Sequence, residues 1–315
     1  MAQAMRVPLL LAALAATAAP LLAQPAAAPF QVRESGQAFA TLQDAINAIG
    51  EGKGTILFAP GRYKQCAVQP AGEIAYVAAE HGTVALERVA CEGKAALVLR
   101  GRSATVEGLI FDNIKVPDAN GAGIRLEKGN LIVRESLFRD SESGILSSND
   151  PASSILVERS TFSGLGRCDR DLACAHSIYI GDYGSLTVRR TRFERGRGGH
   201  YVKTRAARIE VTDSSFDDSA GKTTNYMIDL SAGATGTIAR NVFVQGREKE
   251  NHSAMVMVAA EGRANSSDGL TVVQNDATLA PGMDKPTVLV ADLSGDAVSV
   301  EGNRLGAGVA RFERR

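Results

Sequence analysis

Phenylalanine recurs at short, similar intervals through the middle of the chain. In each copy a Val or Ile stands five residues before the Phe, and in five of the six copies a Ser, Thr or Asn stands two residues before it. The copies end at Phe111, Phe138, Phe162, Phe193, Phe216 and Phe243, so the spacings are 27, 24, 31, 23 and 27 residues. A repeat of this length with irregular insertions is typical of a solenoid, in which each coil packs on the next.

The repeats predict strands rather than helices. They alternate apolar with polar residues, and no apolar pattern of helical period follows Gly50. Leucine-rich repeats and propellers fit less well, because the chain lacks both a helical period and a WD-type signature. We therefore expect an all-β fold, a parallel β-helix whose Val, Ile and Phe columns fill the interior. A polar column is expected to form hydrogen bonds along the stack, at Ser136, Ser160, Thr191, Ser214, Asn241, Asn275 and Asn303.

The residues before the repeats have other predicted roles. Met1 to Ala23 carries one positive charge followed by an apolar run that ends in small residues, as in a secretory signal peptide cleaved after Ala23. Residues 24–38 are expected to be a tether and leading segment. The apolar spacing over residues 42–49, with Thr41 as N-cap, predicts a short amphipathic helix. We expect this helix to cap the first coil of a single domain that spans residues 39–315.

The number of cysteines and the net charge indicate the cellular compartment of the protein and limit its possible partners. Four cysteines suit an oxidising compartment, so we expect a periplasmic or secreted protein with the pairs Cys66–Cys91 and Cys168–Cys174. A zinc site is less consistent, because the cysteines form no CxxC pair or close Cys/His quartet. With 35 basic and 35 acidic residues the net charge is zero, which disfavours nucleic acid and anionic membranes. No later apolar run approaches the roughly 20 residues of a membrane span, and we expect a monomer.

Three short segments carry a resemblance to a known family. They are Asn-Gly-Ala-Gly-Ile-Arg at residues 120–125, Gly-His-Tyr-Val-Lys-Thr-Arg-Ala at 199–206 and Tyr-Met-Ile-Asp-Leu at 226–230. With the coil pattern, they resemble a group of secreted bacterial right-handed β-helix proteins in the pectate-lyase-like superfamily. The resemblance implies a right-handed parallel β-helix solenoid with a short N-terminal capping helix. It also implies a polysaccharide ligand in a groove along one parallel sheet.

A second strand of each coil predicts a stripe of charged and aromatic side chains. Alternation places the following residues outward on consecutive coils, with Arg205 on the same face: Arg125, Leu146, Tyr179, Lys203, Asp229 and Met257. His176 and His200 share one repeat position, and Tyr226 is next in line. We expect the stripe to be exposed, so that removing Lys203 or Arg205 changes stability little. The plainer alternative is a cross-strand ion pair between Lys203 and Asp229, with His176 and His200 as turn residues that bond backbone carbonyls.

The stripe supplies the groups that β-elimination at a uronic acid requires. Arg205 could neutralise the carboxylate, Lys203 or His200 could remove the C5 proton, and Tyr179 could protonate the leaving oxygen. His200 is the better predicted base, because Asp229 would hold Lys203 protonated. His176, Tyr226, Asp229 and Arg125 are predicted to bind substrate.

The residues alone are also compatible with functions other than elimination. Glycoside hydrolysis ranks lower, because it needs two carboxylates roughly 5 to 9.5 Å apart and the stripe offers only Asp229. A non-catalytic glycan-binding or envelope structural protein is the main alternative, although the chain has no Trp and 6 Tyr for stacking on sugars. No cofactor is expected, and calcium is a minor alternative because several acids would have to converge.

Overall fold

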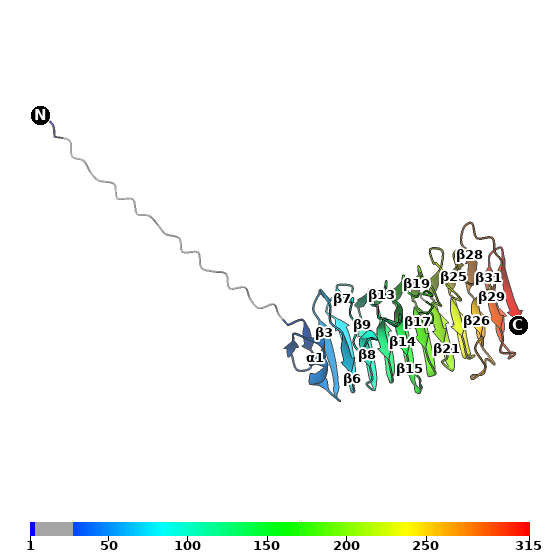
Figure 1. The fold of residues 1–315 in the computed structure, drawn as a ribbon, viewed down its shortest axis with the longest axis horizontal. Coiled ribbons are helices and arrows are strands. Elements are labelled where there is room, and N and C mark those ends of the chain that lie inside the picture. Colours follow the sequence, from blue (N-terminus) through cyan, green and yellow to red (C-terminus); the bar gives the residue numbers. More distant parts are fainter. Residues whose placement is uncertain (4–27, 170) are drawn as a thin grey trace.

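The computed structural model describes residues 1–3, 28–169 and 171–315. Residues 4–23 of the predicted signal peptide, its cleavage site and the start of the tether therefore lie outside the described residues. The described chain coils into three long sheets, and Figure 1 shows the strands stacked along one axis with the helix α1 (Leu42–Ile49) at the N-terminal end. The predicted all-β, parallel β-helix architecture is confirmed.

Each coil contributes one strand to each of three sheets, named A, B and C, and two antiparallel strands before the first coil extend sheet A. Sheet A holds β1 (Phe30–Val32), β2 (Ala38–Phe39), β3 (Lys53–Phe58), β6 (Glu73–Ala78), β9 (Ser103–Glu107), β12 (Asn130–Arg134), β15 (Asp150–Glu158), β18 (Tyr183–Arg189), β21 (Arg208–Thr212), β24 (Thr235–Ala239), β27 (Thr271–Val273) and β30 (Ser299–Glu301). Sheet B holds β4 (Gly61–Tyr63), β7 (Val84–Glu87), β10 (Leu109–Asp112), β13 (Leu137–Arg139), β16 (Thr161–Ser163), β19 (Arg192–Glu194), β22 (Ser215–Asp217), β25 (Val242–Gln245), β28 (Asp276–Leu279) and β31 (Arg304–Leu305). Sheet C holds β5 (Ala67–Gln69), β8 (Ala95–Leu99), β11 (Ala122–Leu126), β14 (Ser143–Ser147), β17 (Ile178–Ile180), β20 (Val202–Thr204), β23 (Ile228–Leu230), β26 (Ala254–Val258), β29 (Thr287–Asp292) and β32 (Val309–Arg314).

The interior is a ladder of phenylalanine rings from sheet B. All six predicted phenylalanines are fully buried, and rings on neighbouring coils stack with centroids 4.7 to 5.0 Å apart. That spacing matches the separation of about 4.8 Å between neighbouring strands, so parallel pairing in register brings like residues together. The β-branched column of sheet A is equally buried. The predicted register of the repeat is thereby confirmed.

The polar column forms the predicted ladder where sheet A turns into sheet B. The backbone N–H of Ser214 donates to Asn241 Oδ1 at 3.0 Å, and the N–H of Asn241 donates to Asn275 Oδ1 at 2.9 Å. The residue before each ladder position has a positive φ, for example 50° at Arg190 and 55° at Arg240. Each of these corners therefore places one residue in the left-handed region, and the ladder satisfies backbone groups that no strand pairs.

The helix α1 caps the first coil as predicted. The Thr41 hydroxyl accepts the N–H of Asp44 at 3.1 Å, and the helix ends at Gly50. Leu42, Ala45 and Ile46 are buried in the same apolar core that the coils share, so the helix covers apolar surface that the first coil would otherwise expose.

Both predicted disulfides are present, one between Cys66 and Cys91 and one between Cys168 and Cys174. Cys66 and Cys91 lie 25 residues apart, which brings them onto neighbouring coils. Two disulfides are consistent with an extracellular or periplasmic protein. Within the described part of the chain, no helix is both long and apolar enough to cross a bilayer.

Candidate functional site

The outward column of sheet C has the predicted register. Arg125 pairs with Leu146, Leu146 with Tyr179, Tyr179 with Lys203, Lys203 with Asp229 and Asp229 with Met257, each across one parallel step. Strands β17, β20 and β23 therefore bring a tyrosine, a lysine and an aspartate side by side. This arrangement follows from alternation along each strand and from repeat alignment between strands.

The stripe is not exposed, and that part of the sequence-based prediction is wrong. Lys203 is 6% exposed and Asp229 only 2%. An apolar cluster that includes Leu146 covers one side, with Tyr179 packed against it, and a second cluster that includes Met257 covers the other, with Tyr226 packed against it. The two charged residues are therefore held between apolar neighbours rather than on a solvated face.

Lys203 and Arg205 converge on one carboxylate that the sequence analysis missed. Lys203 Nζ lies 2.7 Å from Asp229 Oδ2 and 2.5 Å from Glu261 Oε1. The Arg205 guanidinium donates to the other Glu261 oxygen and also to the Tyr179 hydroxyl. Glu261 lies in the long connection after β26, so neither alternation nor the repeat alignment could place it. We call Tyr179, Lys203, Arg205, Asp229 and Glu261 the charged cluster.

The surroundings of Lys203 keep it protonated. Burial pulls its pKa down, but the charges and hydrogen bonds of Asp229 and Glu261 outweigh burial and leave the pKa raised. Lys203 is therefore not available as a base while these contacts hold. Removing one partner of a buried ion pair costs about 3 to 5 kcal/mol, so the expectation that Lys203→Ala leaves stability unchanged no longer applies.

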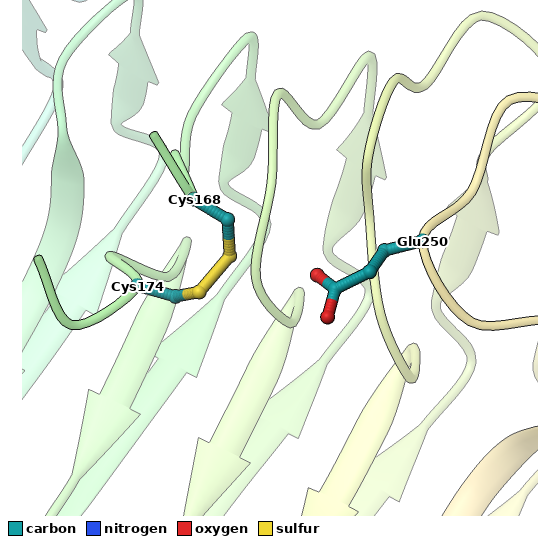
Figure 2. Close-up of side chains that lie close together, drawn as sticks. All are labelled: Cys168, Cys174 and Glu250. Carbon is teal, nitrogen blue, oxygen red and sulfur yellow. A yellow bond between two sulfur atoms is a disulfide. The ribbon is translucent and has the colours of Figure 1, made fainter. Parts of the chain in front are cut away.

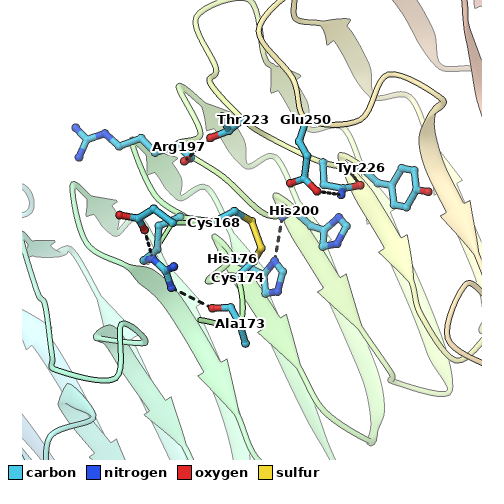
Figure 3. The surroundings of a disulfide bond; sticks show 12 residues. Cys168, Ala173, Cys174, His176, Arg197, His200, Thr223, Tyr226 and Glu250 are labelled. Atoms are coloured by element: carbon cyan, nitrogen blue, oxygen red, sulfur yellow. Dashed lines mark hydrogen bonds and ion pairs between the residues drawn. A yellow bond between two sulfur atoms is a disulfide. The ribbon is translucent and has the colours of Figure 1, made fainter. Parts of the chain in front are cut away.

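His176, His200 and Tyr226 form an aromatic ladder beside the charged cluster, as their shared repeat position predicts. The rings of His176 and His200 stack with centroids 5.0 Å apart, and those of His200 and Tyr226 at 5.5 Å. His176 Nδ1 accepts the backbone N–H of His200 at 3.0 Å, and Figure 3 shows this contact next to the Cys168–Cys174 disulfide. His176 is thus engaged with a backbone N–H, whereas the plainer alternative had expected a carbonyl.

The pKa of His200 weakens its predicted role as the base. Burial, followed by the positive charge of Lys203, lowers this pKa to about 3. The imidazole is therefore neutral at ordinary pH, but it binds a proton too weakly to compete for one from a sugar carbon. Its Nε2 lies 3.6 Å from Asp229 Oδ2, which joins the aromatic ladder to the charged cluster.

A buried carboxylate oxygen at this junction stands without a partner. Among the described residues, Asp229 Oδ1 makes no hydrogen bond within the protein, whereas His200 has a backbone contact with Tyr226. Buried polar atoms of native proteins are nearly always satisfied, by protein groups, ordered water or a ligand. The junction of the ladder and the cluster is therefore a place where a polar ligand group or a water would be stabilised.

A buried ion pair supports the strand that carries His200. Lys249 Nζ lies 3.2 Å from Asp218 Oδ2, and both side chains are completely buried. The Tyr201 hydroxyl donates to Asp218 Oδ1 at 2.7 Å, and Thr224 Oγ1 donates to the same carboxylate at 2.9 Å. Because Tyr201 directly follows His200, this network fixes the start of β20. Lys249 lies in the long connection between β25 and β26, where no repeat alignment could indicate it.

Arg125 belongs to the column but not to the charged cluster. The intervening coil places Leu146 between Arg125 and Tyr179. Arg125 Nη2 instead donates to Ser148 Oγ at 3.2 Å. The structure therefore brings together every predicted site residue except Arg125.

One group of potential metal ligands lies near the ladder. Cys168, Cys174 and Glu250 have ligand atoms within 4.8 Å of one another, the only such group of three found among the described residues. Figure 2 shows that the two sulfurs are bonded to each other, so neither offers the thiolate that a metal would need. These residues do not fit a metal centre.

Comparisons with known proteins support the fold. Residues 90–244 match the family model described as the right handed beta helix region. Among solved structures, the PL6 family alginate lyase AlyGC is 15% identical with a TM-score of 0.53, and a point mutant of the same enzyme gives 0.57. The chain covers only 40% and 38% of those two proteins, while 82% and 83% of its own length is aligned. ORF18 of Geobacillus virus E2 is 16% identical with a TM-score of 0.48, over 86% of this chain and 55% of that one. A search of curated protein sequences finds no match.

Proposed function

We propose, from the premise that this chain belongs to the right-handed parallel β-helix proteins, that it binds an acidic polysaccharide on the outer face of sheet C. The observation that carries the proposal is the pair of cations, Lys203 and Arg205, which hold the two oxygens of one carboxylate. A uronic acid presents the same group. Charge-assisted hydrogen bonds to both oxygens are a strong and geometrically specific way to bind it.

Two further features support a sugar ligand beside the cation pair. Tyr179 and Tyr226 are partly exposed aromatic side chains that pack against apolar clusters on opposite sides of Lys203 and Asp229. The unpaired Asp229 Oδ1 could accept a hydrogen bond from a sugar hydroxyl. Alginate, which the neighbouring lyase's name specifies, is a polymer of uronic acids and belongs to this ligand class.

Elimination is a second candidate function, and the contact between Arg205 and Tyr179 favours it. Because the guanidinium donates to the Tyr179 oxygen, the phenol proton remains free to be given to a leaving oxygen. The cluster as it stands lacks a free base, since Lys203 is protonated and His200 binds protons weakly. Elimination would therefore require Lys203 to lose its carboxylate partners when substrate binds.

Glycoside hydrolysis fits the site less well than either glycan binding or elimination. Glu261 adds a second carboxylate beside Asp229, so the argument from a single acid no longer applies. Both carboxylates, however, contact the Lys203 ammonium. A nearby cation favours the charged form of a carboxylate, whereas hydrolysis needs one of the pair as a protonated acid.

The test is binding of soluble polyuronates, alginate and polygalacturonate, by calorimetry. Arg205→Ala should weaken binding roughly tenfold or more, because it removes a charge-assisted bond to the ligand. Arg205 is 33% exposed on its side chain, so the melting temperature should fall by no more than about 4 °C. Arg208→Ala, an exposed arginine on sheet A, is the matched control and should bind as the parent does.

A parent protein that binds no polyuronate, or an Arg205→Ala variant that binds as tightly as the parent, would refute the proposal. The same samples decide about elimination, since only that reaction creates a conjugated double bond with ultraviolet absorbance. Binding without this absorbance would indicate a protein that binds the glycan without cleaving it by elimination.

A further inference from the structure

Glu261 is the one member of the charged cluster that lies neither in a sheet C strand nor directly after one. Its side chain reaches back over the coil of Asp229 to the coil of Lys203 and Arg205, two coils from its own. It is also the most exposed of the four charged members, at 44% of its side chain. The cation pair is therefore occupied by a group from a loop at the surface.

The loop that carries Glu261 is anchored by its backbone, while its side chains face solvent. The Ala259 N–H donates to the Leu230 carbonyl at 2.9 Å, and Asn265 Nδ2 donates to the Arg205 carbonyl at 3.0 Å. Residues 260–264 between these anchors are exposed. Gly262, next to Glu261, has no atom within 4 Å of the position that a Cβ would take. The backbone N–H of Glu261 donates to the Ser231 carbonyl at 2.9 Å, so it is the exposed side chain, and not the backbone, that can turn away from the cations.

We propose that Glu261 occupies the carboxylate position of the ligand in the free protein, and that a uronate carboxylate replaces it on binding. This inference rests on the proposed function, and it names the group that the ligand displaces. Without such an occupant, Lys203 and Arg205 would place two positive charges side by side with only Asp229 to compensate them. Glu261 thus satisfies the cations until a ligand brings its own carboxylate.

The replacement has two consequences for binding. Any ligand must compete with an internal carboxylate. The measured affinity is therefore the affinity of the open cation pair multiplied by the fraction of protein in which Glu261 has moved away. A neutral sugar cannot replace Glu261 without leaving Arg205 with no carboxylate partner and Lys203 with Asp229 alone. The loop therefore selects for ligands with a free carboxylate.

Glu261→Gln tests the inference, because the amide keeps the size of the side chain and loses its charge. Oligogalacturonate should bind the variant at least about tenfold more tightly than the parent, whereas its methyl ester should show no gain. Glu250→Gln is the matched control, since it removes the same charge from another exposed loop residue near Tyr226, as Figure 3 shows. Its gain should stay below about twofold, because only screened, long-range attraction changes.

Each outcome decides between the two proposals. An equal or weaker affinity of Glu261→Gln, with the parent binding normally, overturns the inference and leaves the proposed function standing. Equal gains in Glu261→Gln and Glu250→Gln also overturn it, since they would show a general charge effect. Absence of binding by the parent and by both variants overturns the proposed function, and the inference with it.

Discussion

His200 is surrounded by groups that disfavour a charged imidazole. Its ring lies between those of His176 and Tyr226, and burial together with Lys203 lowers its pKa to about 3. In an unfolded chain the pKa of histidine is near 6.5. Between these two values the unfolded state binds more protons than the folded state, so the free energy of unfolding falls as the pH falls through this range.

We predict that His200→Gln reduces the loss of stability on acidification. A shift from about 6.5 to about 3 corresponds to roughly 4 to 5 kcal/mol, most of it lost by pH 4. The measurement is the difference in melting temperature between pH 7 and pH 4 for parent and variant. His81→Gln is the control, because His81 is at the surface beside Glu135. Equal pH dependence in the parent and in His200→Gln would contradict this account of His200.

The sequence predicted which residues of the site are neighbours but not how deeply they lie. Lys203 and Asp229 occupy the same strand position one repeat apart, so their contact followed from alignment. Their burial depends on the apolar neighbours of the same sheet and on Glu261, whose connection after β26 has neither strand alternation nor a counterpart in other coils. Glu261 and Lys249 were missed for the same reason, since each comes from a connection rather than from a repeated strand.

At the scale of the strands, the phenylalanine ladder carries the interior of the solenoid. Phe193 stacks on Phe162 at 5.0 Å and on Phe216 at 4.8 Å, so its removal leaves a cavity bordered by two coils. We predict that Phe193→Ala lowers the free energy of unfolding by about 3 to 5 kcal/mol. Val242→Ala, at an exposed position at the start of β25, should have little effect.

Chemical denaturation followed by circular dichroism measures both variants. A midpoint for Phe193→Ala that matches the parent would mean that the coils close around the missing ring. Because each coil contacts mainly its neighbours, the unfolding transition could also lose cooperativity, and its slope should be compared as well.

The strand positions were predictable because the repeat is a packing constraint. Stacked coils require like residues at like positions, and the columns of Phe193 and Val188 keep that rule across insertions. The corners between sheets A and B were less visible in the sequence. Their left-handed residue is Glu135, Arg159, Arg190, Asp213 or Arg240 in different coils, so no single residue type signals the turn.

At the scale of the whole molecule, α1 closes the N-terminal end of the stack. Its buried face contacts β1, β3 and β5, while Ala48 on the opposite side is exposed. We predict that Ile46→Glu loosens this cap, because it places a charge in the apolar core, and that the uncovered coil then drives self-association. Light scattering after size-exclusion chromatography should detect the larger species.

Ala48→Glu adds the same side chain to the exposed face of the helix and should elute as the parent does. If Ile46→Glu remained the same size as the parent and kept its melting temperature, the helix would be an appendage rather than a cap.

The connections between sheets also divide the surface into a fixed edge and a variable one. From β12 to β28 every step from sheet A to sheet B takes two residues, whereas the steps that lead into and out of sheet C range from two residues to fourteen. Chain length can therefore change beside the charged cluster without disturbing the stack. A protein built in this way could acquire a new ligand by exchanging whole loops, while the stacked sheets that support them stay unchanged.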